Sequence, residues 1–292
     1  MVGLTESALT LIESAAPVKA LFVGERIWDE YHYVTALGKS PKEHLITVAY
    51  EDQEVFEGGV VAAASHARGF CAGVWICTGS TAVRKVRMVD RTYLRKLFEI
   101  HYNEPPDEIG LPDTTPFDVV VVTDFGHGLV TEGLVEALVG LPTYLAVNAQ
   151  TNSSNVGFNL ITKYPRADYV VIDEPEARLA AHDRTGKIED VIQELAYGRY
   201  TKMVVTLGVH GAIGYEDGEF TRRPAMTQQV VDTMGAGDAF FAVTALMAQR
   251  GRMDDLLLIG NAAGALKTQI VGHRASVTKA ALLEYMRTHG SD

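Results

Sequence analysis

The sequence has few cysteines, no long apolar run and no common metal-binding spacing. It contains 2 Cys in 292 residues, and Cys71 and Cys77 are not part of the paired CxxC motifs or Cys/His cluster of a tetrahedral metal site. No apolar run reaches the length of a membrane span, and Glu6 and Glu13 interrupt the N-terminal segment where a signal peptide requires an apolar core. These absences predict a cytoplasmic protein with reduced thiols, an amphipathic first helix and no membrane partner.

Positive charge is also scarce. The chain has 26 Lys and Arg against 37 Asp and Glu, a formal net charge of -11, which repels nucleic acid at long range. Its 47% hydrophobic and 22% charged residues match ordinary globular proteins and exclude a disordered or fibrous chain. An acidic protein can still bind phosphate through backbone amides at a helix N-terminus, so such a site is expected in a loop.

Short β-branched segments alternate with helical patterns along most of the chain. Six segments have this character: ALFVG near 20, GVWIC near 73, DVVVVTD near 118, TYLAVN near 143, DYVVID near 168 and KMVVTLG near 202. Their continuous apolar runs are typical of strands buried on both faces of a parallel sheet. The sequence therefore predicts an α/β fold with a central, mainly parallel sheet, closed after residue 238 by two or three helices.

One segment departs from this pattern. Residues 31–56 alternate polar and apolar side chains, which predicts a half-exposed antiparallel hairpin set apart from the core. No internal repeat and no linker rich in Pro, Gly or Ser marks a second independent domain. We expect one domain over residues 1–292 with a small β lid at about 31–57.

The most specific string is VVDTMGAGDAFFAVTALM, which begins at Val230. Gly235 and Gly237 allow successive backbone amides to turn toward one point, and the apolar run after them begins a helix whose N-terminus faces that point. Asp238 stands at this helix start, where a carboxylate is either a plain N-cap or a base beside bound phosphate. The clustered glycines favour an anion-binding loop.

This string resembles the D-T-x-G-A-G-D signature of the ribokinase-like, PfkB-type carbohydrate kinases. The matching positions are Asp232, Thr233, Gly235, Ala236, Gly237 and Asp238. The resemblance extends over most of the chain and implies the ribokinase-like fold, with helices flanking the sheet and a β lid. It also implies transfer of the ATP γ-phosphoryl group to a sugar hydroxyl, with Asp238 as base and the amides of Gly235, Ala236 and Gly237 binding the developing charge.

The resemblance also implies binding residues outside this loop. Substrate contacts are expected at the G-x-x-x-x-D that starts at Gly24, at the Gly-Gly pair, at the DFGHG loop and at the end of one strand, namely at Asp29, Gly58, Gly59, Asp124, His127, Asn148 and Gln150. Nucleotide contacts are expected in TLGVHG and on a C-terminal helix, at Thr206, Gly208, Gly211, Asn261 and Gly264. The G-x-G-x-x-G and G-x-x-x-x-G-K-[ST] spacings are missing, which argues against a Rossmann oxidoreductase and a P-loop kinase.

Mg²⁺ is expected to accompany ATP, because a site this acidic requires a cation to hold a triphosphate. Glu176 is the candidate that organises the metal, through water. It belongs to Asp173-Glu174-Pro175-Glu176, where the family commonly has N-x-x-E. The other interpretation is a helix N-terminus with acids in its first turn and Pro in a favoured position, and both interpretations can hold together.

Asp29-Glu30-Tyr31, Ser40-Pro41 and the DFGHG loop resemble a D-x-Y, a lid Ser-Pro and a D-Y-G-K-G of one group in the family. Within the family, the chain is thus most similar to the kinase domain that phosphorylates heptose 7-phosphate. Three departures weaken this assignment. Ala62 replaces an Asn after the Gly-Gly pair, His127 stands where a Lys is usual, and Asn148-Ala149-Gln150 replaces Asp-Pro-Lys. Two fixed positive charges are thus lost from the substrate side, so the acceptor is left open between sugars and sugar phosphates.

Two other functions remain as alternatives. A nucleoside kinase of the same fold requires an aromatic stacking wall near the lid, for which Trp28, Tyr31 and Tyr33 are candidates. A non-catalytic sugar- or nucleotide-binding protein is consistent with Ala62 but not with the complete GAGD string. Because an exposed β edge tends to pair with another chain, the lid also predicts a homodimer.

Overall fold

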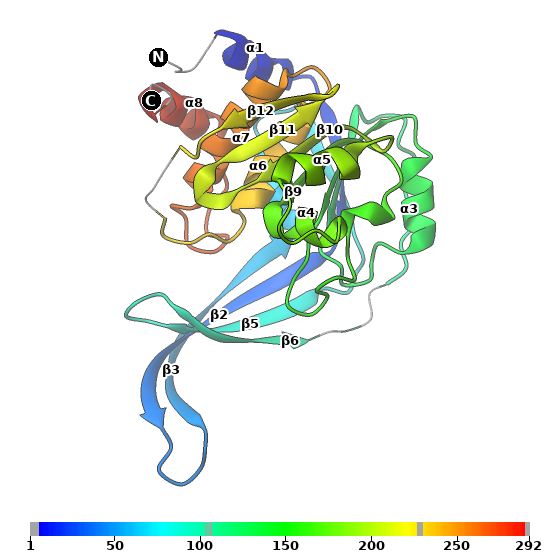
Figure 1. Ribbon diagram of the computed structural model, residues 1–292. Helices are drawn as coiled ribbons and strands as arrows, with labels where there is room; N and C mark the ends of the chain where they lie inside the picture. The colour runs from blue at the N-terminus through cyan, green and yellow to red at the C-terminus, as the bar shows by residue number, and fades with distance from the viewer. Residues whose placement is uncertain (1–5, 103, 105–106, 227–229, 290–292) are drawn as a thin grey trace.

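The computed structural model describes residues 6–102, 104, 107–226 and 230–289. These residues form an α/β body built on one sheet, and a second sheet that projects from the body as a long arm (Figure 1). The two sheets meet where β1 ends at Gly24 and β2 begins at Arg26.

The larger sheet has eight strands in the order β12-β11-β10-β9-β8-β7-β1-β4. Its strands are β1 (Lys19–Gly24), β4 (Gly73–Cys77), β7 (Val119–Asp124), β8 (Tyr144–Ala149), β9 (Ala167–Asp173), β10 (Tyr200–Thr206), β11 (Ala212–Glu216) and β12 (Glu219–Arg223). The first six are the six predicted strands, and they pair in parallel, whereas β11 and β12 add an antiparallel edge. All residues of β7 are buried, as expected for a strand covered on both faces.

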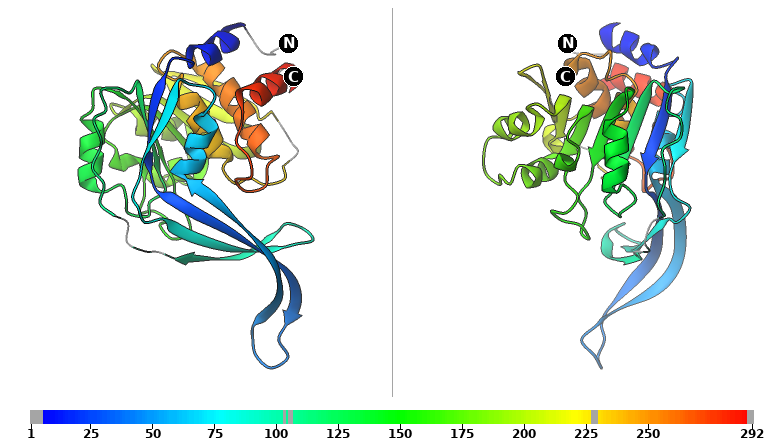
Figure 2. Two further views of the ribbon diagram at one scale, coloured as in Figure 1. Left: turned by 180° about the vertical axis from the view of Figure 1, so that it is seen from behind. Right: turned by 90° about the vertical axis from the view of Figure 1, so that its right-hand side faces the viewer.

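Helices cover both faces of this sheet (Figure 2). One face carries α1 (Glu6–Ser14), α2 (Val60–Ala67), α6 (Ala236–Ala245), α7 (Met253–Lys267) and α8 (Lys279–His289). The other face carries α3 (Glu132–Val139), α4 (Glu174–Ala180) and α5 (Ile188–Ala196). Within the described ranges, no helix is both long and apolar enough to cross a bilayer. The predicted α/β fold with a central, mainly parallel sheet flanked by helices is thus confirmed.

The second sheet has four strands in the order β3-β2-β5-β6. Its strands are β2 (Arg26–Lys39), β3 (Ile46–Gly59), β5 (Val83–Asp90) and β6 (Lys96–Tyr102). The predicted hairpin forms β2 and β3, which extend far beyond the body (Figure 2). β5 and β6 were not predicted from the sequence, because charged residues interrupt their apolar residues and leave no continuous apolar run.

The inner face of this second sheet is buried. Ile27, Asp29, Tyr31 and Tyr33 alternate along β2 with more exposed neighbours. Lys85 on β5 is the cross-strand neighbour of Asp29 and also of His101 on β6. Side chains at paired positions point to the same face, so these three polar residues share the inner face.

Candidate active site

The GAGD segment forms a glycine-rich turn that leads into α6. Gly235 is the N-cap, with φ of 74°, a left-handed conformation that Gly adopts without strain. A Cβ at Gly237 would meet nothing within 4 Å, so the loop is open at this point. Asp238 follows as the third residue of α6 and is therefore not the N-cap. The interpretation of Asp238 as a plain N-cap is wrong, because Gly235 is the N-cap residue and Asp238 lies inside the first turn of α6.

Asp238 is held by a chain of amide side chains. Gln150 donates through Nε2 to Asp238 Oδ1 at 2.5 Å and to Asn148 Oδ1 at 3.0 Å, and Asn148 in turn donates to the Val171 carbonyl at 2.7 Å. Burial raises the pKa of Asp238, although His273 and the Gln150 hydrogen bond oppose that shift. The result is an oriented carboxylate with increased basicity, which suits a general base.

A cavity of about 570 Å³ lies on one side of the loop. All five residues predicted to contact nucleotide line it, namely Thr206, Gly208, Gly211, Asn261 and Gly264, together with Ala236 and Gly237 of the loop. Asn261 also donates to the Pro224 carbonyl at 3.0 Å, so its amide helps to shape the wall. The structure therefore brings together residues from β10, α6 and α7 that are distant in sequence.

A smaller polar cavity of about 200 Å³ contains Asp238 and Glu176. Glu176 accepts hydrogen bonds from the Thr151 amide and the Asp173 amide, both at 2.8 Å, and Asp173 completes a capping box at the start of α4. Burial, followed by the nearby Asp173, raises the pKa of Glu176 to about 8. The helix-start interpretation is correct, and Glu176 also faces the same cavity as Asp238.

This cavity has few protein ligands for a metal. Among the described residues, no group of three or more His, Cys, Asp and Glu side chains is arranged to hold an ion. The carboxylates of Asp173 and Glu176 nevertheless line the cavity, and burial raises the pKa of each. Two neighbouring acids with raised pKa values, Glu176 buried and Asp173 exposed, fit a cation that also takes ligands from phosphate and water.

Asp29, Gly58 and Gly59 meet at the base of the arm. A Cβ at Gly58 would lie 2.4 Å from Asp29 Oδ2, so the glycine allows close approach. Asp29 forms ion pairs with Arg87 and, at 3.3 Å, with His273. Burial opposes its ionisation, but the hydrogen bonds from His273 and Arg87 lower the pKa of Asp29 to about 2. Asp29 therefore remains charged at neutral pH.

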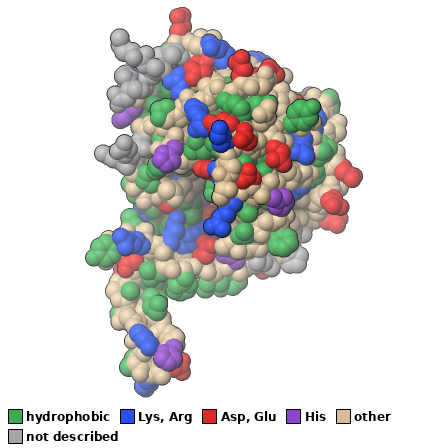
Figure 3. All heavy atoms as spheres, in the orientation of Figure 1, with side chains coloured by type: hydrophobic (Ala, Val, Ile, Leu, Met, Phe, Trp, Pro, Cys, Tyr) green, Lys and Arg blue, Asp and Glu red, His purple; other side chains and the backbone are tan. Residues whose placement is uncertain are grey.

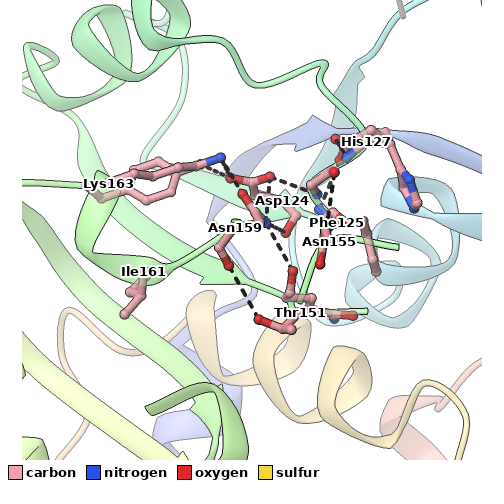
Figure 4. Close-up of polar contacts among 12 residues, drawn as sticks. Asp124, Phe125, His127, Thr151, Asn155, Asn159, Ile161 and Lys163 are labelled. Carbon is pink, nitrogen blue, oxygen red and sulfur yellow. Dashed lines mark hydrogen bonds and ion pairs between the residues drawn. The ribbon is translucent and has the colours of Figure 1, made fainter. Parts of the chain in front are cut away.

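Asp124, predicted to contact substrate, has no exposed surface. Tyr164 donates to Asp124 Oδ2 at 2.7 Å, Lys163 forms an ion pair with it, and Asn159 donates to Oδ1 at 3.2 Å. Figure 4 shows this carboxylate at the centre of the network. Because Asp124 has no exposed surface at all, whereas Asp29 retains 4%, we leave Asp124 out of the proposed substrate contacts.

Glu25 is a structural residue that the sequence analysis missed. Its carboxylate accepts the amides of Phe125 and His127, each at 3.0 Å, and so fixes the DFGHG loop. Burial, followed by the charge of Asp124, raises the pKa of Glu25 to about 7. Nothing in the local sequence indicates this role, because the partners lie about 100 residues away.

This shift predicts a pH dependence of stability. Between pH 4.5 and about 7, Glu25 keeps its proton in the folded protein but loses it in the unfolded chain. The free energy of unfolding therefore falls as pH rises through that window, by up to about 1.4 kcal/mol per pH unit. We expect Glu25→Gln to flatten this fall. Thermal unfolding of both proteins from pH 5 to 8 checks it, and an unchanged slope in the variant contradicts it.

His127 and Lys85, near the site, are two basic side chains whose nitrogen atoms lack hydrogen-bond partners among the described residues. His127 Nε2 is buried without a hydrogen-bond partner in the described part of the chain, and burial, followed by Lys85, lowers the pKa of His127 to about 4. Lys85 is only 7% exposed, and its ammonium makes no hydrogen bond or ion pair with the described residues. The sequence analysis missed Lys85, Arg87 and His273. The alternation in VRKVRMVD could have indicated the first two, whereas a single His in a loop gives no signal.

Comparisons with known proteins show which sequences and folds this chain is similar to. The pfkB family carbohydrate kinase profile matches residues 158–280. The bifunctional protein HldE of Rhodopseudomonas palustris is 23% identical over 286 residues, covering 83% of this chain and 58% of that protein. A probable fructokinase-6 of Arabidopsis thaliana is 26% identical over 129 residues, covering 41% of this chain and 34% of that protein. The chain thus spans between about a quarter and just over half of the curated relatives it matches.

Solved structures share the fold at low identity. Arabidopsis thaliana ribokinase, in complex with ribose and ATP, has a TM-score of 0.71 and 15% identity, with 93% of this chain and 99% of that chain covered. Phosphofructokinase-2 of Escherichia coli has a TM-score of 0.70 and 13% identity, with 94% and 99% covered. The profile match, the relatives and the fold agree with the D-T-x-G-A-G-D signature. The chain is therefore similar to the pfkB family carbohydrate kinases over residues 158–280 and shares the fold of ribokinases.

Proposed function

We propose that the protein transfers the γ-phosphoryl group of ATP to a hydroxyl of a sugar or sugar phosphate. The observation that carries this proposal is the position of Asp238. Its buried carboxylate lies in a polar cavity that shares Gly237, Thr206 and Asp173 with the larger cavity. A base at such a junction can meet an acceptor hydroxyl and a bound triphosphate at the same time.

In this mechanism, Asp238 accepts the proton of the acceptor hydroxyl as that oxygen attacks the γ-phosphorus. Gln150 orients the carboxylate through its hydrogen bond. The amides of Gly235, Ala236 and Gly237 bind the negative charge on the transferring oxygens, where an open glycine loop and a helix N-terminus favour anions. ATP occupies the larger cavity in contact with the five predicted nucleotide residues.

Mg²⁺ supplies charge neutralisation between the ATP phosphates when bound. Glu176 is the proposed organiser, through water, and Asp173 lines the same cavity. Both carboxylates have raised pKa values caused by burial, and a cation at this point would offset their mutual repulsion.

The acceptor is proposed to carry an anionic group. Among the described residues, the Lys85 ammonium makes no hydrogen bond or ion pair; Lys85 lies on the inner face beside Asp29, and burial, followed by the charge of Lys85, lowers the pKa of His127. A buried cation without a partner costs free energy, which a bound phosphate would recover. Lys85 thus supplies the positive charge that neutral His127 and Gln150 do not. A phosphorylated sugar of the heptose or hexose type is therefore the acceptor that best fits this site. Asp29, Gly58 and Gly59 remain proposed contacts to the sugar.

The experiment that tests this function measures ADP release from Mg·ATP against a panel of hexoses, heptoses and nucleosides. Sugars are supplied with and without a phosphate group. Stimulation of ADP release by sugar phosphates supports the proposal and names the substrate class. Binding of ATP without stimulation by any acceptor contradicts it and favours a non-catalytic binding protein.

The nucleoside alternative receives little support from the aromatic residues. Tyr31 and Tyr33 are 2% and 3% exposed. The Tyr31 hydroxyl contacts Asp232 and Met234, and the Tyr33 hydroxyl donates to Glu54. Two side chains packed in this way do not present a free face to a base.

A homodimer through the arm is proposed from its exposed apolar side chains. These are Ile46, Tyr50, Val55, Phe98, Ile100 and Tyr102, with exposed fractions between 39% and 75%. Figure 3 shows hydrophobic side chains on the exposed surface of the second sheet, below the body. We expect light scattering at micromolar concentration to give the mass of a dimer, and a monomer alone contradicts this prediction. The cytoplasmic location stays a prediction.

A further inference from the structure

Lys267, the last residue of α7, has an ammonium group with no exposed surface. Its Nζ donates to the carbonyls of Gly272 at 2.7 Å and Met234 at 2.8 Å, with a longer contact to the Ile270 carbonyl at 3.4 Å. Three carbonyl acceptors match the three N–H groups of a protonated amine. A buried cation is thus enclosed in a cage of backbone oxygens.

The cage joins two loops that are also joined by an anion. Asp232 accepts the amide of Met234 at 3.1 Å and the amide of Gly272 at 2.9 Å. Lys267 therefore binds the carbonyls of the same two residues whose amides Asp232 binds. Met234 and Gly272 are each held at both the N–H and the C=O, and the two loops cannot shift relative to each other without breaking charged hydrogen bonds.

This arrangement bears directly on the phosphate loop. Met234 precedes Gly235, whose Cα lies so close to Lys267 that a Cβ there would be 3.2 Å from Lys267 Cε. Gly272 precedes His273, which pairs with Asp29 and contributes to the electrostatic environment of Asp238. The ammonium thus lies beside Gly235, at the start of the loop, whereas Gly237 has open space where a Cβ would lie.

We propose that Lys267 is a built-in monovalent cation, a positioning residue that fixes the Gly235–Gly237 loop, so that the protein needs no dissolved monovalent ion at this cage. Carbonyl cages that hold an ammonium group suit K⁺ and NH₄⁺ as well, because these ions also take several carbonyl oxygens as ligands. Shortening the side chain to Ala leaves the oxygens in place without their cation. The resulting site is then open to a dissolved ion of this class.

The experiment compares wild type, Lys267→Ala and Lys267→Met in KCl, NH₄Cl and tetramethylammonium chloride at equal ionic strength. The first readout is the Tm without substrate, which does not depend on knowing the acceptor. We expect the wild-type Tm to be the same in all three salts, and K⁺ and NH₄⁺ to raise the Tm of Lys267→Ala by about 2–4 °C over tetramethylammonium. Lys267→Met, whose side chain fills the cage with apolar atoms, should not respond.

The second readout is turnover with the best acceptor. In tetramethylammonium, Lys267→Ala should lose about 10- to 100-fold in kcat with little change in the KM for ATP, because a loop displaced by a fraction of an ångström misaligns the reacting groups. K⁺ or NH₄⁺ should recover part of this loss. If the variant folds only in K⁺ or NH₄⁺, the refolding yield in each salt replaces Tm as the readout and supports the same conclusion.

Lys202 provides a matched control. It is also a buried lysine that donates to two backbone carbonyls, those of Ala248 at 3.0 Å and Gly251 at 2.6 Å, but it lies at the far end of β10 and also pairs with Glu216 at 3.0 Å. Lys202→Met should lower the Tm without a salt response and without loss of kcat. Activation of the wild type by K⁺ over tetramethylammonium overturns the proposal, as does a Lys267→Ala protein that behaves the same in all three salts.

Discussion

Asp238→Asn is expected to lower kcat by about 10²- to 10⁴-fold, which is the range that a positioned general base contributes. The asparagine retains an oxygen that can accept the Gln150 hydrogen bond, so the geometry of the site is preserved. The variant loses only the ability to take a proton. The KM for ATP should therefore stay near its wild-type value, because the loop amides and the larger cavity are unchanged.

The thermal stability of Asp238→Asn, in contrast to its kcat, should not fall. Burial raises the pKa of Asp238, which means that the charged carboxylate is unfavourable in the folded protein near neutral pH. Removing the charge should leave the Tm unchanged or higher. Loss of turnover together with retained Tm separates a catalytic effect from misfolding, and near-normal turnover would remove Asp238 as the base.

Asp190→Asn serves as the matched control. Asp190 is the third residue of α5, just as Asp238 is the third residue of α6, but it is exposed and lines neither cavity. Both changes remove a carboxylate that interacts with a helix N-terminus. Only Asp238→Asn should alter kcat, so a similar loss in both variants would indicate a general effect of helix stability.

Lys85→Met is expected to lower kcat/KM for a phosphorylated acceptor by about 100-fold, the loss of a charge-assisted hydrogen bond worth about 2.7 kcal/mol. The unphosphorylated sugar has no anionic group near Lys85, so its kcat/KM should not fall. The protein itself should become more stable, since burial lowers the pKa of Lys85 and the side chain has no described partner. Parallel kinetics with the two acceptors and a Tm measurement check all three expectations.

Arg84→Met is the control for this change. Arg84 precedes Lys85 on β5, points to the opposite face and pairs there with Glu30. Its removal changes the net charge by the same amount but does not alter the inner face. An equal loss for both acceptors in Lys85→Met, or an equal effect of Arg84→Met, would contradict an anion-binding role for Lys85.

The parts of the site that could be predicted from sequence are contiguous segments. The Gly235–Asp238 loop was predicted because glycine spacing, a following apolar run and one carboxylate act over a few residues. The six parallel strands were predicted for the same reason, since continuous apolar runs reflect burial of each strand separately. The nucleotide residues required the resemblance, because no local rule connects β10 with α7.

The parts that could not be predicted depend on partners remote in the chain. Glu25 has its role only because the DFGHG loop folds over it, and Asp124 is engaged by Tyr164 and Lys163 rather than left open. The sequence analysis therefore assigned a substrate role to Asp124 and none to Glu25. In both cases the decisive quantity was burial with specific hydrogen bonds, which the identity of the residue does not specify.

The sequence by itself determined the fold class, and it predicted a glycine-rich loop with Asp238 at the start of a helix, because these follow from periodicity and from backbone conformations that few residues allow. Only the tertiary structure decided which charges meet. Strand register brings Lys85 beside Asp29, and the packing of the 270–272 segment against Met234 encloses the Lys267 ammonium. Such pairings arise from long-range packing, in which burial strengthens electrostatic interactions and makes every unpaired charge costly.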